Sequence, residues 1–400
     1  MHLKPRLIYI VTDARSTGFL SGQLSWMISR GFEVAVCSSQ GDRLMETSER
    51  EGVKVFPIEM AREIDLLRDV NSVFALYSLF RKWQPDIVNA ATPKAGLLGM
   101  LAAKYAGVPV RIFHQYGLRL ETTKGLKRVV LSATERITAM CAHRVIAVSD
   151  SLARKYKSLG FAPPEKICVL ASGSSNGVVF EKYASPSRAI VKALRKRMGL
   201  TEDNPVVGFV GRFSKDKGII ELVEAFDRLR IEFPSLKLLL VGDFEDGDPV
   251  PSQTVDRIKR EPDILTTGFV NDAAPYYSLM DVLAFPSYRE GFPNAPLEAA
   301  AAGIPVVGFK ATGTVDAVVH GVTGTLVEIG DVTDLAAALA RYLSDDKLRR
   351  KHGMAGQQRA REEFDPERIW TLLLDEYKQL LRAAGRPLPV PSGVTRSKAT

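Results

Sequence analysis

The 400-residue chain has few cysteines and no long apolar run. Its three cysteines, Cys37, Cys141 and Cys168, are far apart in sequence and form no C-x-x-C spacing. They suggest neither a disulfide framework nor a thiolate metal site, so a reducing cytoplasm is the expected compartment. No stretch reaches the ~18 uninterrupted apolar residues that a bilayer span needs. The first apolar run, at 7–11, is shorter than the core of a signal peptide, and we expect a buried strand there.

Extremes of composition are also absent. Hydrophobic residues make up 46% of the chain and charged residues 25%, with 31 Gly and 22 Pro. These values are typical of soluble globular proteins and exclude collagen-like, disordered and disulfide-rich classes. Because 400 residues exceed the usual domain length of about 150, we expect two domains.

What the chain does have is an uneven distribution of charge. Residues 1–200 contain 30 Lys and Arg against 16 Asp and Glu, whereas residues 201–400 contain 24 against 30, so the net charges are +14 and −6. A basic half would attract a nucleic acid, an anionic lipid surface or a phosphorylated acceptor, although solubility alone also explains such an asymmetry. Nucleic acid is disfavoured, because the cations are dispersed and the sequence has no zinc spacing or recognisable nucleic-acid motif.

Short apolar runs alternate with longer amphipathic segments along the chain, which is typical of β-α units on a parallel sheet. The predicted strands are 7–11, 33–38, 53–58, 86–90, 110–114, 144–148 and 167–170 in the first half, and 206–210, 236–241, 264–269, 282–286, 305–308 and 325–329 in the second. The fold class is therefore α/β, with two doubly wound domains that we expect to face each other.

The domain boundaries follow from these elements. The predicted parts are an N-terminal Rossmann-like domain at 1–185, a linker at 186–204, a C-terminal Rossmann-like domain at 205–364, a terminal helix at 365–384 and a disordered tail at 385–400. The helix is predicted by apolar residues at helical spacing after an Asp-Pro start. The tail is predicted because Pro, Gly, Ser and Lys predominate there without a period.

The first candidate ligand-binding motif follows the predicted strand at 206–210, and doubly wound domains bind their ligands at the carboxyl ends of such strands. Residues 211–218 read G-R-F-S-K-D-K-G, with Arg212 and Lys217 flanking a turn that leads into a helix. Two cations beside a helix N-terminus suit a pyrophosphate. For this octapeptide alone, a solvated turn with surface cations is an equal alternative.

The second motif, at 286–298, reads P-S-Y-R-E-G-F-P-N-A-P-L-E and joins a strand to a helix. Asn294 is predicted to be the N-cap of this helix, with Pro296 in the first turn. Because a carboxylate can accept two hydrogen bonds from a vicinal diol, one of Glu290 and Glu298 could hold ribose hydroxyls while the other faces a sugar. The alternative makes Glu298 a partner of the helix dipole and Glu290 a turn residue.

These motifs resemble the nucleotide-sugar half of family 4 glycosyltransferases. The resemblance rests on G-R-F-x-x-x-K-G, on E-G-F-P-N-x-P-L-E-A-x-A-x-G-x-P-V-V and on the glycine segments at 312–314 and 321–324, and it covers most of residues 205–330. The first half is similar to a subgroup that builds bacterial surface polysaccharides or lipid-linked oligosaccharides, through residues 21–23, 117–121 and 173–178.

The resemblance implies a GT-B fold, in which the N-terminal domain at 1–185 is the acceptor domain and the C-terminal domain at 205–364 is the nucleotide-sugar donor domain. It also implies transfer with retention at the anomeric carbon. It implies that Arg212 and Lys217 bind the diphosphate, Glu298 the ribose and Glu290 the donor sugar. The donor-binding residues expected in all are Gly18, Arg212, Lys217, Glu290, Gly291, Phe292, Asn294 and Glu298. His114, at a strand end, matches a position where the family often has a histidine near the donor sugar, although it could equally be structural. His114 and Glu290 are the expected catalytic residues.

The chemistry expected of this family requires no metal and no cofactor. Cleavage of a sugar–diphosphate bond leaves negative charge on the nucleoside diphosphate, which fixed cations and helix N–H groups stabilise. The triplet Asp246-Gly247-Asp248 resembles a D-x-D metal motif of other glycosyltransferases, but we interpret it as a solvated surface loop. UDP is the default nucleotide, and no protein nucleophile is assigned.

The expected acceptor is a saccharide, with a polyprenyl diphosphate-linked sugar as one candidate in bacterial polysaccharide synthesis. A cytoplasmic enzyme acting on such a lipid would touch the inner membrane face peripherally. Residues 124–143 combine Lys124, Lys127, Arg128 and Arg136 with Leu126, Val130, Ile137 and Met140, and this segment could lie on a membrane surface. The sequence favours the alternative that this helix merely packs on its own sheet.

Other functions remain open at this level. A sugar-nucleotide epimerase of the same fold would act on the donor without an acceptor, and a non-catalytic sugar-nucleotide binding protein would bind without turnover. An NAD-dependent dehydrogenase is disfavoured, because neither half has G-x-G-x-x-G after its first strand with an acidic residue ~20 positions later.

Overall fold

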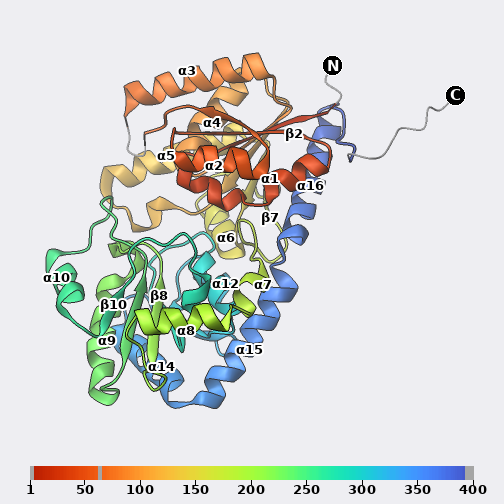
Figure 1. Cartoon of the computed structure of the whole chain (residues 1–400). Helices are drawn as coiled ribbons and strands as arrows, with labels where there is room; N and C mark the ends of the chain where they lie inside the picture. The colour runs from red at the N-terminus through yellow and green to blue at the C-terminus, as the bar shows by residue number, and fades with distance from the viewer. Residues whose placement is uncertain (1–3, 62–64, 392–400) are drawn as a thin grey trace. The chain divides into compact units, whose positions relative to one another are not determined.

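The computed structural model describes residues 4–61 and 65–391 of the chain. The chain divides into two compact units: unit 1 comprises residues 1–176 together with 366–400, and unit 2 comprises residues 177–365. Each unit is an α/β layer structure, and Figure 1 shows its helices and strands by label.

Unit 1 is built on a seven-stranded sheet with the order β3-β2-β1-β4-β5-β6-β7, in which every pairing is parallel. Its strands are β1 (Arg6–Ile10), β2 (Glu33–Ser38), β3 (Lys54–Pro57), β4 (Ile87–Ala91), β5 (Val110–Gln115), β6 (Arg144–Ala147) and β7 (Ile167–Val169). Its helices are α1 (Gln23–Ser29), α2 (Asp42–Glu51), α3 (Leu66–Trp83), α4 (Pro93–Tyr105), α5 (Gly125–Cys141), α6 (Asp150–Ser158) and α16 (Pro366–Ala383), with short 3-10 helices η1 (Ala14–Leu20), η2 (Arg119–Thr122) and η3 (Pro164–Lys166). The central strands are buried on both faces, which explains their continuous apolar sequences.

Unit 2 repeats the same winding on a six-stranded parallel sheet with the order β10-β9-β8-β11-β12-β13. Its strands are β8 (Val206–Val210), β9 (Lys237–Val241), β10 (Ile264–Thr266), β11 (Val282–Phe285), β12 (Val306–Phe309) and β13 (Gly324–Val327). Its helices are α7 (Phe180–Ala184), α8 (Arg188–Arg197), α9 (Ile219–Glu232), α10 (Ser252–Arg260), α11 (Ala274–Tyr277), α12 (Asn294–Ala301), α13 (Thr314–Ala317), α14 (Val332–Ser344) and α15 (Asp346–Glu363), with the 3-10 helix η4 (Lys215–Lys217).

The predicted strands correspond to the observed ones with small shifts at their ends. The largest difference is at β10, which ends at Thr266, whereas the predicted strand extends to Phe269. Gly268 has a left-handed backbone, φ 67°, so the chain turns before the end of the predicted strand. The α/β class with two doubly wound domains is confirmed.

The boundary between the units differs from the predicted one. The chain leaves unit 1 after Asn176, not at 185, and the expected linker at 186–204 contains helix α8. This helix has a buried Leu194, and its Arg197 donates a hydrogen bond of 2.6 Å to the Tyr276 hydroxyl. The 186–204 segment is therefore part of unit 2, because its helix packs there.

The terminal helix α16 is present where it was predicted, but it belongs to unit 1. Its Leu373, Tyr377 and Leu381 are fully buried in the core cluster that contains Leu7 and Phe32. The Tyr377 hydroxyl accepts a hydrogen bond of 2.6 Å from Asn89 of β4. A chain segment distant in sequence thus completes the core of the first sheet.

Part of the predicted tail is also packed in unit 1. Arg386 forms an ion pair of 2.9 Å with the buried Asp86, and Leu388 packs against the unit 1 core. A Cβ atom on Gly31 would lie 2.1 Å from the carbonyl oxygen of Val390. The prediction of disorder from residue 385 is therefore wrong for 385–391, and residues 392–400 lie outside the described residues.

Candidate active site

The two motifs of the second half lie together at the carboxyl ends of β8 and β11. Gly218 has a left-handed backbone, φ 70°, and a Cβ there would lie 2.1 Å from the carbonyl oxygen of Pro286. The Tyr288 amide donates a hydrogen bond of 2.9 Å to the carbonyl of Asp216. Glycine at 218 is thus required for the turn after β8 to lie against the turn after β11.

Lys217 and Glu290 form an ion pair across these two turns. Their side chains are only 16% and 12% exposed, respectively. Attraction between charges at this depth is screened less than on an open surface. The structure therefore brings together the cation predicted for the diphosphate and the carboxylate predicted for the donor sugar.

Arg212, the other predicted diphosphate ligand, is paired with a residue that the sequence reading did not select. Its Nη1 atom donates a hydrogen bond of 2.9 Å to Oε2 of Glu245, which lies in the loop after β9. The Arg212 side chain is 51% exposed, whereas that of Glu245 is 13% exposed. The guanidinium is therefore held at one side and open to solvent at the other.

Asp216 lies between the cations of the site. Its carboxylate accepts hydrogen bonds from the Ser214 hydroxyl at 2.5 Å and from Arg289 at 2.7 Å. Burial raises the pKa of Asp216, but the Ser214 hydrogen bond and the charges of Arg289, Lys217 and Arg212 outweigh it and lower the pKa overall. Asp216 is therefore ionised at neutral pH, holds Arg289 by an ion pair and attracts Lys217 and Arg212 through its charge.

Two polar atoms near these turns lack partners. Within the described part of the chain, the Nε atom of Arg289 and the hydroxyl of Thr314 are buried without a hydrogen-bond partner. Thr314 follows Gly313, whose Cβ position would lie 2.4 Å from the carbonyl oxygen of Gly291. Buried polar atoms without partners are costly, and a polar ligand is one way to satisfy them.

Glu298 lies on α12, and its carboxylate accepts a hydrogen bond of 2.7 Å from the Tyr277 hydroxyl. Burial raises the pKa of Glu298, and hydrogen bonds from Tyr277 and Tyr183 oppose this shift without cancelling it. The rings of these two tyrosines meet edge to face, with centroids 5.8 Å apart. The tyrosines therefore fix the orientation of the carboxylate, which is the candidate for ribose binding.

The start of α12 differs from the prediction. Pro293 is the N-cap and Asn294 is the first helical residue, without a side-chain capping hydrogen bond. The prediction that Asn294 caps the helix is therefore wrong, because the extended backbone (φ −78°, ψ 129°) falls on the preceding proline. Pro296 does lie in the first turn, as expected. The Phe292 ring is buried against Phe364, with centroids 5.2 Å apart, and so anchors the Gly291–Asn294 turn to unit 2.

The remaining predicted residues, Gly18 and His114, belong to unit 1. Gly18 lies exposed in η1, and a Cβ there would meet no atom within 4 Å, so the fold of unit 1 does not itself require glycine. His114 is buried near the end of β5, and its ring meets that of Tyr116 edge to face with centroids 5.0 Å apart. Burial lowers the pKa of His114 to about 4, so the imidazole is neutral at pH 7.

The D-x-D triplet has a structural role in the described protein. The Asp248 carboxylate accepts a hydrogen bond of 2.8 Å from the Asp216 amide, and its carbonyl accepts one of 3.3 Å from Lys215. Asp246 is exposed to solvent. Among the residues that the structure describes, no group of three or more His, Cys, Asp or Glu side chains is placed to hold a metal ion.

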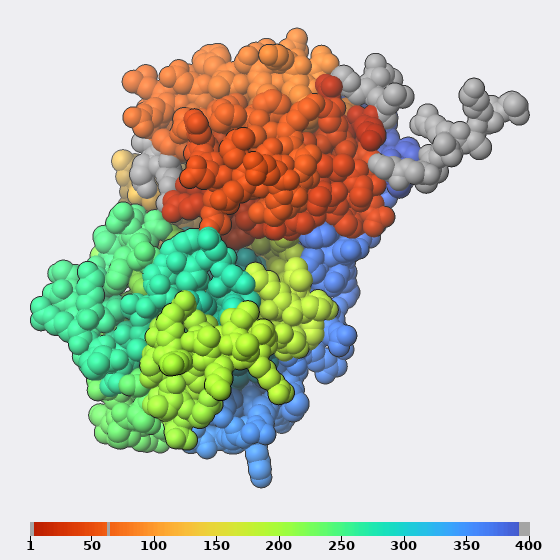
Figure 2. Space-filling model, in the orientation of Figure 1, coloured from red at the N-terminus to blue at the C-terminus, as the bar shows by residue number. Residues whose placement is uncertain are grey.

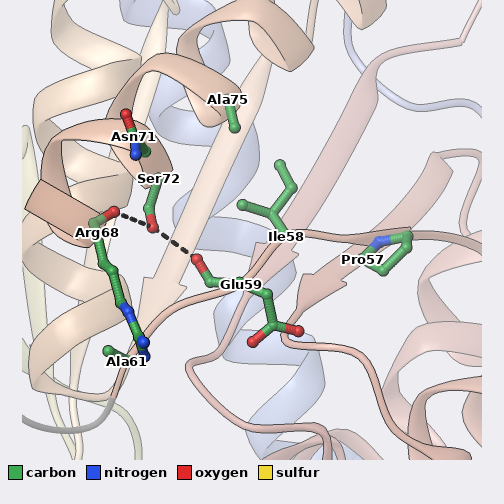
Figure 3. A pocket seen from close by; sticks show the side chains of 8 residues that line it. All are labelled: Pro57, Ile58, Glu59, Ala61, Arg68, Asn71, Ser72 and Ala75. Atoms are coloured by element: carbon green, nitrogen blue, oxygen red, sulfur yellow. Dashed lines mark hydrogen bonds between the residues drawn. The ribbon is translucent and has the colours of Figure 1, made fainter.

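A cavity of about 510 Å³ lies in unit 1, away from the residues selected from the sequence. It opens between the end of β3 and α3, and Figure 3 shows the side chains that line it. The Ser72 hydroxyl donates hydrogen bonds to the carbonyl oxygens of Glu59 at 2.6 Å and Arg68 at 2.8 Å and so fixes the backbone at its wall. None of the predicted site residues contributes to this cavity.

From the sequence, the loop after β9, which contains the Asp246–Asp248 triplet, is interpreted as a solvated loop, and neither Glu245 nor Asp248 is assigned to the site. Glu245 and Asp248 lie far from both motifs in sequence, yet they hold Arg212 and the Asp216 turn. A signal was available, because β9 pairs directly with β8 and the loops at the carboxyl ends of neighbouring parallel strands share one edge of the sheet.

Comparison with known proteins gives matches over both halves of the chain. Residues 191–359 match the family model for glycosyl transferases group 1, and residues 19–173 match the glycosyl transferase 4-like domain. The capsular polysaccharide biosynthesis glycosyltransferase CapM of Staphylococcus aureus is 36% identical over 377 residues, which cover 94% of this chain and 98% of CapM.

Two further proteins are similar. The UDP-Gal:alpha-D-GlcNAc-diphosphoundecaprenol alpha-1,3-galactosyltransferase of Escherichia coli is 30% identical over 293 residues, covering 72% of this chain and 74% of that enzyme. The structure of Anabaena Alr3699/HepE in complex with UDP-glucose superposes with a TM-score of 0.76 at 22% identity, covering 94% of this chain and 99% of that one.

The similarity to the HepE structure supports the fold, and the match to CapM over nearly the full length of both chains shows the family. The expectation from the two motifs is confirmed: the chain belongs to family 4 of the glycosyltransferases and has the GT-B fold.

Proposed function

We propose that the chain transfers a hexosyl or N-acetylhexosaminyl residue, with retention, from a UDP-sugar to a saccharide linked to polyprenyl diphosphate. The observation that carries the donor part is the junction of the two turns in unit 2, where Lys217 pairs with Glu290 beside Arg212 and Arg289. The acceptor part is supported by the similar Escherichia coli enzyme, whose name specifies a UDP-galactose donor and a sugar on diphosphoundecaprenol.

The cations of this junction would stabilise the negative charge of the leaving group. As the sugar–phosphate bond breaks, negative charge grows on the UDP diphosphate, and Lys217 and Arg212, whose charges both act on Asp216, would stabilise it together. Lys217 would exchange its bond to Glu290 for a bond to a phosphate oxygen. Because this exchange would accompany binding of the donor, the cations would be in place before the bond breaks, and little reorganisation would accompany the reaction.

The carboxylates would then bind the uncharged parts of the donor. Once Lys217 moves to the phosphate, Glu290 is free to accept hydrogen bonds from hydroxyls of the donor sugar. Glu298, oriented by the Tyr277 hydroxyl, would accept hydrogen bonds from the ribose diol. The buried Arg289 Nε and Thr314 hydroxyl offer further donors for such a ligand.

His114 and Gly18 would act from unit 1. A neutral imidazole cannot repel or attract the diphosphate by charge, so His114 would donate or accept a hydrogen bond to a sugar hydroxyl. The open space above Gly18 would let a phosphate approach its backbone amide. The leaving phosphate would help to deprotonate the acceptor hydroxyl, and no protein nucleophile is assigned.

Thermal unfolding with UDP, GDP, ADP and NAD, each with and without EDTA, tests the donor part. A ligand at about 100 times its Kd adds about 2.7 kcal/mol of stability, a readable shift of a few degrees. Stabilisation by UDP that survives EDTA is expected, and stabilisation by NAD alone would refute the donor site. Incubation of the UDP-sugar with a polyprenyl diphosphate sugar, followed by NMR of the new anomeric proton, tests transfer and retention.

A further inference from the structure

Glu135 of helix α5 is a buried carboxyl group that the proposed function does not use. The residue is only 7% exposed. On the face of unit 1 that Figure 2 shows, the surface is formed mostly by red and orange residues from the start of the chain. Burial raises the pKa of Glu135 to about 8, and among the described residues no cation opposes this shift. Because a buried carboxyl group without a cation is costly and an apolar side chain would pack at lower cost, its presence points to a role other than packing.

Helix α5 packs on unit 1 through its polar side. Glu135 and Thr138 are buried there, and the Arg128 side chain donates a hydrogen bond of 2.8 Å to the Leu120 carbonyl. The sequence favours packing of this helix on its own sheet, but the apolar residues singled out in it are exposed: Leu126, Val130, Ile137 and Met140. Of the helices in the described residues, α5 included, none is long and apolar enough to cross a membrane. The orientation of α5 is therefore set by its polar contacts.

The Glu135 carboxyl group holds the side chain of Gln115, the last residue of β5. Gln115 is fully buried, and its Nε2 atom donates a hydrogen bond of 2.8 Å to Oε2 of Glu135. Oε1 of the same side chain accepts a hydrogen bond of 3.1 Å from the Gly117 amide. Because the NH2 group of Gln115 must face the carboxyl oxygen, Glu135 decides that Oε1 faces Gly117. Glu135, Gln115 and the Gly117 amide therefore form one chain of hydrogen bonds.

The backbone at both ends of the Glu135–Gln115 contact is anchored as well. The Gln115 carbonyl accepts a hydrogen bond of 3.3 Å from the Val148 amide, directly after β6. The hydroxyl of the fully buried Tyr156, on α6, donates one of 3.2 Å to the Glu135 carbonyl. These contacts fix the strand end and the helix separately, so the Gln115 side chain is the link that carries the position of the helix to the turn after β5.

Tyr116 lies between Gln115 and Gly117 in this turn. Its ring meets that of His114 edge to face with centroids 5.0 Å apart, and that of Phe19 with centroids 5.6 Å apart. Phe19 directly follows Gly18 in the sequence. Through Tyr116, the turn therefore contacts His114 and the neighbour of Gly18, the two positions predicted for the site in unit 1.

We propose that Glu135 is a positioning residue for sugar transfer: through Gln115 and the Gly117 amide it fixes the turn that holds Tyr116 against His114. Without Glu135 the Gln115 amide could turn over, and the Gly117 amide would lose its acceptor. A displacement of about 1 Å at a reacting group can cost about 100-fold in rate. The effect on transfer rests on the proposed function, in which His114 contacts the donor sugar, whereas the fixing of the turn does not.

Hydrogen exchange of the full-length protein without substrate tests whether Glu135 fixes the turn. Met has nearly the length of Glu and Gln, but its sulfur accepts hydrogen bonds only weakly. Glu135→Met should speed exchange at the Gly117 amide about three- to tenfold, as expected for the loss of one hydrogen bond. Gln115→Met should speed it at least as much. Glu135→Gln keeps an oxygen that can accept from Gln115, so exchange should remain slow.

Steady-state kinetics of transfer test the consequence for the reaction. Glu135→Met should lower kcat by about tenfold or more and change KM for the UDP-sugar by less than about twofold, because the residues proposed to hold UDP lie in unit 2. Glu135→Gln should keep most of the activity. Because Glu135 acts through Gln115, Glu135→Met/Gln115→Met should lose no more activity than Gln115→Met alone.

Thr138→Val is the matched control on the same buried side of α5. Thr138 is 2% exposed, and its hydroxyl donates a hydrogen bond of 2.8 Å to the Thr134 carbonyl within the helix. The substitution removes a buried hydrogen bond without touching the turn at 115–117, so exchange at Gly117 and kcat should both be unchanged. Stabilisation of each variant by UDP checks that it is folded. If Glu135→Met does not fold, Gln115→Met tests the same chain of hydrogen bonds.

Two results would overturn the positioning role. One is that Glu135→Met behaves like Thr138→Val in both measurements. The other is that the losses of Glu135→Met and Gln115→Met add up in the double variant, because the two residues would then act independently. If the unaltered protein transfers no sugar, the proposed function is wrong, and exchange at Gly117 alone decides whether Glu135 fixes the turn.

Discussion

The ion pair between Lys217 and Glu290 predicts opposite effects on UDP affinity when each of the two residues is replaced. In the free protein the ammonium of Lys217 is neutralised by Glu290, and both side chains are largely buried. If UDP binds through Lys217, its diphosphate must replace the Glu290 carboxylate as the partner of the ammonium. Lys217 would then favour UDP, and Glu290 would compete with it.

The magnitudes follow from the kind of contact involved. Loss of a hydrogen bond to a charged group costs about 1.5–3 kcal/mol, so Lys217→Ala should weaken UDP binding by about 10–150-fold. Two negative charges about 5 Å apart repel by about 3 kcal/mol at an effective dielectric constant of about 20. Because the site is partly open to solvent, we expect about 1 kcal/mol of this to remain, and Glu290→Gln should bind UDP about fivefold more tightly.

Isothermal titration calorimetry with UDP measures both variants directly. Lys237→Ala is the matched control, because Lys237 pairs with Asp263 at similar exposure but at the amino end of β9. It should bind UDP normally. The reasoning is refuted if Lys217→Ala keeps the affinity of the unaltered protein, or if Glu290→Gln binds UDP more weakly. With a UDP-sugar as donor, Glu290→Gln should lose transfer activity even though it binds UDP well.

Three other outcomes are expected. Burial raises the pKa of Glu135 from 4.5 to about 8, above its value in the unfolded chain. The free energy of unfolding should therefore be unaffected by this group below about pH 4.5 and should fall by about 3–5 kcal/mol between pH 4.5 and 8. Urea unfolding of Glu135→Gln should show no such decline. Gly218→Ala should lower the free energy of unfolding by about 2 kcal/mol or more, because its φ of 70° and the nearby Pro286 carbonyl exclude a side chain; a smaller change in chemical unfolding would contradict this. Since the Asp248 carboxylate is bound by a backbone amide, EDTA and the variant Asp246→Asn should both leave sugar transfer unchanged, and loss of activity in either would restore the D-x-D triplet as a metal site.

Much of the site could be selected from the sequence because its residues lie in two short motifs placed directly after strands. Arg212, Lys217, Glu290 and Glu298 all lie in unit 2, as expected. The pairing of Lys217 with Glu290 could not be predicted, because it depends on the close approach that Gly218 permits. The contacts of Glu245 with Arg212 and of Asp248 with the Asp216 amide could not be predicted for the same reason, since they cross between loops of different strands.

The sequence alone determined the class of the fold, the approximate positions of the strands and the family. These properties depend on local patterns: apolar runs of strand length, glycines in turns and short motifs at fixed spacing. Tertiary structure decided which segments pack against each other and which side of each helix is buried. Helix α16 is distant in sequence from β1 yet completes its core, and residues 385–391 pack although their composition predicts disorder. Helix α5 faces its apolar side outward because Glu135 and Arg128 hold its polar side inward. Burial and pairing depend on contacts between distant segments, and a one-dimensional pattern does not contain them.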